Sequence, residues 1–144
     1  MLLGDPMISL HLQLTLVFLH YYCIYGLGFI VSALVRREDG PLLCMLLSLI
    51  TSALSGSAPR LSTVRDWHLA WFWYAWPATW FSEAFVQGNI NPLGYLYDLG
   101  DAFAYTGFKA GRMAMDIAFL IFIGTAYRLL SYALFVLWGW KSLH

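Results

Sequence analysis

The chain has 144 residues, of which 60% are hydrophobic and 11% are charged, whereas a soluble domain carries roughly 25% charged residues. Its formal net charge is zero, so it lacks the basic balance expected of a protein that binds nucleic acid. The composition therefore predicts an integral, multi-pass membrane protein with membrane lipids as partners, and no nucleic acid.

The first predicted span covers residues 9–35. This stretch contains no Asp, Glu, Lys or Arg and no strand-like alternation, and it exceeds the about 20 apolar residues that a helix needs to cross a bilayer. Arg36 and Arg37 follow it, and a short polar turn leads to Pro41. Because proline suits the first position of a helix, a second helix is expected to begin there.

The second predicted span covers residues 41–58 and ends before Pro59. Small, weakly polar side chains lie on or beside one stripe of this helix: Cys44, Ser48, Thr51, Ser52 and Ser55. Small residues let membrane helices approach closely, and polar groups inside a membrane can also mark a substrate path. The stripe therefore either packs against another helix or lines a path, and both interpretations place it inward.

A tryptophan-rich segment, WHLAWFWYAWPATWFSEAF, occupies residues 67–85 and holds five of the seven tryptophans. Only 16 residues, 67–82, precede its first acidic residue, and Pro77 divides them, so the segment is short for a crossing. Tryptophan and tyrosine favour the headgroup level of a membrane. We therefore predict a re-entrant or interfacial helical hairpin over residues 67–86, with non-helical backbone near Pro77.

An external loop with a short surface helix is predicted over residues 87–114, which are rich in glycine, proline and charge. The third predicted span covers residues 115–140. The expected fold is thus an all-α membrane protein with three transmembrane helices and a re-entrant aromatic hairpin between the second and third. With three crossings, the turn after the first span and the C-terminus share one side of the membrane, and residues 59–114 lie on the other.

Two charged residues, Glu83 and Arg128, are expected at membrane depth, where a charge is costly and normally faces protein or water. Asp116 lies about 18 Å from Arg128 along the same helix at 1.5 Å per residue, which is too far for pairing. Arg128 is therefore expected to meet Glu83, to meet hydroxyls and carbonyls of the second span, or to extend toward the headgroups.

No catalytic, cofactor-binding or metal-binding residues are predicted. His20 and Cys23 could share a metal ion, but two ligands do not make a zinc site, and packing is the favoured role. The sequence contains no G-x-x-x-x-G-K-[ST] phosphate loop, so the chain alone has no machinery for nucleotide binding and is not expected to be an enzyme by itself.

Three short motifs, at residues 80–85, 107–116 and 127–132, resemble those of a known family. Residues 80–85, Trp-Phe-Ser-Glu-Ala-Phe, are similar to the W/Y-x-x-E-A-[FL] run of a re-entrant helix, and residues 127–132, Tyr-Arg-Leu-Leu-Ser-Tyr, to an R-[LF]-x-[AS]-Y run. Gly-Phe-Lys at 107–109, followed by Asp116, resembles the loop before the last helix. The chain thereby resembles the C-terminal half of the membrane domain of White-type, or G-subfamily, ABC transporters, an ABC type-2 transporter transmembrane domain.

The resemblance covers nearly all of residues 1–144 and implies that the three spans are the fourth, fifth and sixth helices of that domain. It implies part of an ATP-driven exporter of lipophilic compounds, sterols or lipids, working as a dimer with a second half-transporter. ATP and magnesium would bind a nucleotide-binding domain outside this sequence. The remaining transmembrane helices would also lie outside it. The alternative is a small, non-transporting helical membrane protein that scaffolds a partner.

Overall fold

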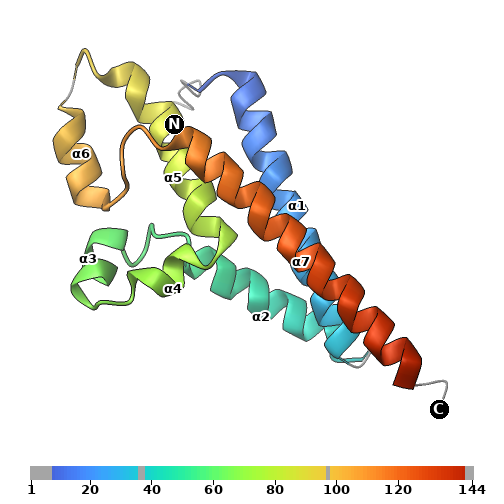
Figure 1. Cartoon of the computed structure of the whole chain (residues 1–144). Helices are drawn as coiled ribbons and strands as arrows, with labels where there is room; N and C mark the ends of the chain where they lie inside the picture. The colour runs from blue at the N-terminus through green and yellow to red at the C-terminus, as the bar shows by residue number, and fades with distance from the viewer. Residues whose placement is uncertain (1–7, 36–37, 97, 142–144) are drawn as a thin grey trace.

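The computed structural model describes residues 8–35, 38–96 and 98–141, with side chains as far as residue 137 (Figure 1). Arg36 and Arg37, which follow the first predicted span, lie outside the described residues. The described residues form only helices and turns: α1 (Leu10–Leu34), α2 (Gly40–Ala53), α3 (Leu61–Asp66), α4 (Ala70–Tyr74), α5 (Pro77–Ile90), the 3-10 helix η1 (Asn91–Leu93), α6 (Leu99–Thr106) and α7 (Met113–Lys141).

Helices α1 and α7 are long and apolar enough to cross a membrane, and they correspond to the first and third predicted spans. Large side chains on both helices point away from the rest of the chain; Phe18 is 69% exposed and Phe122 is 68% exposed. Only 22% of the apolar window of α1 and 17% of that of α7 are buried. A helix in the core of a soluble protein would be mostly buried, so these exposed apolar faces suit a lipid environment.

Helices α1 and α7 pack side by side and run in the same direction (Figure 1). Two glycines permit the close approach: a Cβ added to Gly26 would lie 2.9 Å from Tyr127 Cβ, and one added to Gly124 would collide with the Tyr22 ring. The Cys23 thiol donates a hydrogen bond of 3.1 Å to the Leu120 carbonyl across the same interface. Because the two helices are parallel, residues 35–112 must return along their length.

Helix α2 is shorter than the second predicted span, since it ends at Ala53 and not at residue 58. Its 14 residues are about 21 Å long at 1.5 Å per residue, less than the hydrocarbon thickness of about 30 Å. The physical reason lies in the turn that follows. Gly56 adopts a φ of +80°, a left-handed conformation that favours glycine, and the Leu54 carbonyl accepts a hydrogen bond from Thr79 instead of continuing the helix.

The tryptophan-rich segment forms α4 and the start of α5, and the helical backbone breaks between them at Trp76, where ψ is 142°. Pro77 then occupies the first turn of α5, where its missing N–H costs nothing. The Thr79 hydroxyl lies 2.7 Å from the Leu54 carbonyl and 2.8 Å from the Trp73 carbonyl, so it joins the ends of α2, α4 and α5. Trp80 Nε1 donates to the Tyr74 carbonyl at 2.7 Å. The predicted break is present, and α5 continues four residues past the predicted end at 86.

The predicted external loop contains the end of α5, η1 and α6, and it docks on α3. Gly107 follows α6 with a φ of +83°, and a Cβ there would collide with the backbone of Ser62. Arg65 Nη2 donates to the Gly107 carbonyl at 2.6 Å, and Ser62 Oγ donates to the Tyr105 carbonyl at 3.0 Å. These bonds fasten the end of α6, at residues 105–107, to α3.

Candidate functional site

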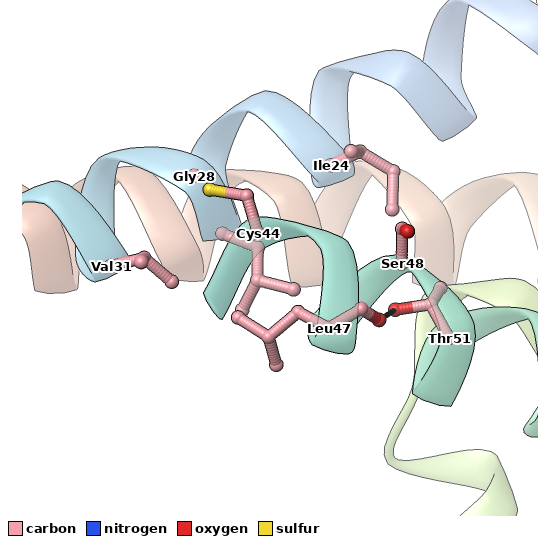
Figure 2. Close-up of a pocket in the computed structure, with 8 residues that line it drawn as sticks. Ile24, Gly28, Val31, Cys44, Leu47, Ser48 and Thr51 are labelled. Carbon is pink, nitrogen blue, oxygen red and sulfur yellow. Dashed lines mark hydrogen bonds between the residues drawn. The ribbon is translucent and has the colours of Figure 1, made fainter. Parts of the chain in front are cut away.

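A narrow cavity of about 70 Å³ separates α1 from α2 (Figure 2). It is lined by Ile24, Leu27, Gly28, Val31, Cys44, Leu47, Ser48 and Thr51. The close-up shows the Thr51 hydroxyl bonded to the Leu47 carbonyl of its own helix, at 2.7 Å (Figure 2).

A larger cavity of about 370 Å³ lies among α1, α2 and α5. It is lined by His20, Tyr21, Ile24, Ser48, Thr51, Ser52, Ser55, Ala78, Phe81 and Ser82. These side chains are apolar, aromatic or hydroxyl-bearing, and none of them is an acidic residue, a lysine or an arginine. Such a lining is suited to a largely apolar ligand with few hydrogen-bonding groups.

All five small residues of the predicted stripe on α2 border these two cavities. Cys44 lines the narrow cavity, Ser52 and Ser55 line the larger one, and Ser48 and Thr51 line both. The Ser48 hydroxyl donates to the Met45 carbonyl at 2.8 Å, as Thr51 does to Leu47. The helical spacing in the sequence predicts that these residues share one face. Only the tertiary structure shows that α1 and α5 are the neighbours of that face.

Arg128 does not meet Glu83, contrary to the first of the expected pairings. Its guanidinium carbon lies 4.2 Å from the centre of the Tyr22 ring on α1, a cation–π contact. Glu83 instead accepts the backbone N–H of Lys109 at 3.2 Å, near the start of α7. Arg128 is about 18 Å further along α7 than Asp116, which lies in the first turn of that helix. Arg128 and Glu83 therefore contact different parts of the chain.

A buried polar network connects α5 to the start of α7. Glu83, Gln87 and Asp116 are fully buried. Gln87 Nε2 donates to Asp116 Oδ2 at 3.0 Å, and Gln87 Oε1 accepts the N–H of Arg112 at 3.2 Å. Burial raises the pKa of Glu83, and the hydrogen bond from the Lys109 N–H opposes that rise.

Sequence reasoning missed Gln87 and the role of Asp116 in this network. The available signal was the spacing of Glu83 and Gln87, since side chains four residues apart lie on the same face of a helix. That signal shows a shared polar face in an apolar segment, but it does not show which loop covers the face.

His20 and Cys23, considered above as a metal pair, have different partners. The His20 ring packs on Phe81 with ring centres 4.6 Å apart, and the Cys23 thiol donates to the Leu120 carbonyl. In the part of the chain that the structure describes, no group of three or more His, Cys, Asp or Glu side chains is placed to hold a metal ion. The geometry of both residues is that of helix packing.

Comparisons with known proteins give one similarity to a transporter. No family model matches the sequence, and no solved structure does. The ABC-type transporter claG of Penicillium crustosum is 45% identical to the chain over 102 residues, which are 71% of this chain and 14% of that protein. The chain therefore spans only a small part of its relative's length. The two long apolar helices indicate a membrane protein. The similarity in turn supports a relationship to ABC transporters.

Proposed function

We propose that the chain forms part of the membrane domain of a White-type ABC transporter that exports lipophilic compounds, sterols or lipids. The observation that carries this proposal is the 45% identity to an ABC-type transporter over 102 residues. The resemblance of residues 80–85 and 127–132 to G-subfamily motifs adds the subfamily. ATP and magnesium would act in a nucleotide-binding domain outside this sequence, and a second half-transporter would complete a dimer.

The larger cavity is the best candidate for a substrate path. Its lining carries hydroxyl groups on apolar walls, and burying an ionic substrate there without a partner charge would be costly. The Ser48 and Thr51 hydroxyls bond to carbonyls of α2 itself. Helix α2 can therefore shift against α1 without breaking these bonds, as an alternating-access mechanism driven by ATP requires.

Filling the larger cavity should block transport. Ser52→Phe places an aromatic ring at the wall of the larger cavity, whereas Leu49→Phe adds an aromatic ring to α2 at a position that does not line the cavity. In the full-length gene product, we expect Ser52→Phe to slow ATP-dependent uptake of a fluorescent sterol into inverted membrane vesicles at least fivefold. Leu49→Phe should retain most of the rate.

Equal rates for the two variants, at matched protein levels, would remove the cavity from the transport path. If the wild-type vesicles show no ATP-dependent uptake above that of control membranes, the result would contradict the proposed function itself and would favour a non-transporting scaffold.

A further inference from the structure

Two buried oxygen atoms of the α5–α7 network lack a hydrogen-bond partner. Glu83 Oε1 and Asp116 Oδ2 each accept one bond, but Glu83 Oε2 and Asp116 Oδ1 are inaccessible to solvent and have no partner among the described residues. An ionised carboxylate offers about four lone-pair positions to donors. The two carboxyl groups therefore have far fewer hydrogen-bond donors than two buried, ionised carboxylates require. A proton on one of them would reduce the number of donors that are needed.

The basic residues around the pair are engaged elsewhere. Arg65 of α3 donates to the Gly107 carbonyl and to the Tyr74 hydroxyl on α4. Arg112 donates from Nη2 to Met115 Sδ at 2.6 Å, and Lys109 contributes its backbone N–H to Glu83. The positive charges of these residues favour the ionised form of Glu83 from a distance. None of them donates a hydrogen bond to Glu83 Oε2 or Asp116 Oδ1.

Glu83 and Asp116 belong to one buried network, because Gln87 lies one helical turn from Glu83 and donates to Asp116. Two negative charges in such a network disfavour double ionisation, and a proton on either carboxyl group lessens both the repulsion and the shortage of donors. We propose that one of the two carboxyl groups, Glu83 or Asp116, is protonated in the folded chain, with the proton taken up from water, so that this network is a proton-binding site joining α5 to α7. Loss of that proton leaves two negative charges in the contact and favours separation of α5 from the first turns of α7. The inference is independent of the proposed transport function, because it concerns the folded chain alone.

Infrared spectroscopy of the purified chain in lipid nanodiscs tests this proposal. At neutral pH we expect the C=O absorption of one protonated carboxylic acid per chain, shifted to lower frequency in D₂O. The double variant Glu83→Gln, Asp116→Asn should lose that absorption. Asp101→Asn, which changes an exposed carboxylate on α6, is the matched control and should keep it. A wild-type spectrum with ionised carboxylates alone, or an absorption that persists in the double variant, would overturn the proposal.

Because the double variant could fail to fold, a second measurement uses the wild-type chain only. Dicyclohexylcarbodiimide takes up the proton of a buried carboxylic acid and forms a stable N-acylurea with it. Mass spectrometry of the labelled chain should locate the adduct at Glu83 or Asp116. Adducts confined to exposed carboxylates such as Asp101 would overturn the proposal independently of any substitution.

Discussion

Gly26→Leu is expected to separate α1 from α7 and to destabilise the chain by about 3 kcal/mol or more, at the upper end of the cost of overpacking. The Cβ of any larger residue at this position would lie 2.9 Å from Tyr127 Cβ and 3.5 Å from the Gly124 carbonyl oxygen. Neither atom is the end of a flexible side chain, so the helices themselves must move apart. Thermal unfolding in detergent, followed by helical circular dichroism and by the yield of monodisperse protein, measures the effect.

Gly28→Leu is the matched control, two residues further along the same helix. A Cβ added there meets no heavy atom within 4 Å, so the change should cost less than about 1 kcal/mol, as for other substitutions away from packed contacts. An equal loss of stability in both variants would show that glycine flexibility, and not close helix packing, explains the requirement at position 26.

Gln87→Leu is expected to detach the 107–112 loop from α5. Leucine preserves most of the volume but leaves the Arg112 N–H and Asp116 Oδ2 without their partner. Each unsatisfied buried group costs about 1–3 kcal/mol, so the loss should be about 3 kcal/mol. Limited proteolysis at Lys109 and Arg112, together with the thermal midpoint, measures both the opening of the loop and the loss of stability.

Asn89→Leu is the control on the same helix. Asn89 donates to the Phe85 carbonyl of α5 itself and is only half-buried, so its removal should cost under about 1 kcal/mol and leave the loop protected. If Gln87→Leu leaves the cleavage rate unchanged, the hydrogen-bonded network does not hold the loop in place.

Local sequence patterns predict the elements whose formation depends on neighbouring residues in the sequence. The long apolar runs predict α1 and α7. Pro77 predicts the break between α4 and α5, because proline restricts the backbone of the residue before it. The end of α2 could not be located in this way. It depends on Thr79, which is 25 residues away in the sequence and donates a hydrogen bond to the Leu54 carbonyl. The apolar pattern of residues 54–58 predicts helix, whereas α2 ends at Ala53.

In the candidate site, too, the features set by helix geometry could be predicted, and the contacts between helices could not. The spacing of Ser48, Thr51 and Ser55 predicted a shared face, since helix geometry alone fixes it. The ring that Arg128 contacts and the loop that covers Glu83 depend on which helices become neighbours, which one sequence does not reveal. Charge in an apolar segment does not by itself identify the residue that the charge contacts.

Whether residues 40–90 return through the membrane between two parallel spans is tested most directly by the sidedness of three single cysteines. Asp39→Cys, Asp66→Cys and Tyr95→Cys all lie at exposed positions, and each is labelled with a membrane-impermeant maleimide after Cys23 and Cys44 are replaced by alanine. We expect Asp66→Cys and Tyr95→Cys to react from one side of the membrane and Asp39→Cys to react from the other. Labelling of the first two from opposite sides, or of all three from the same side, would contradict the hairpin and the return crossing, respectively.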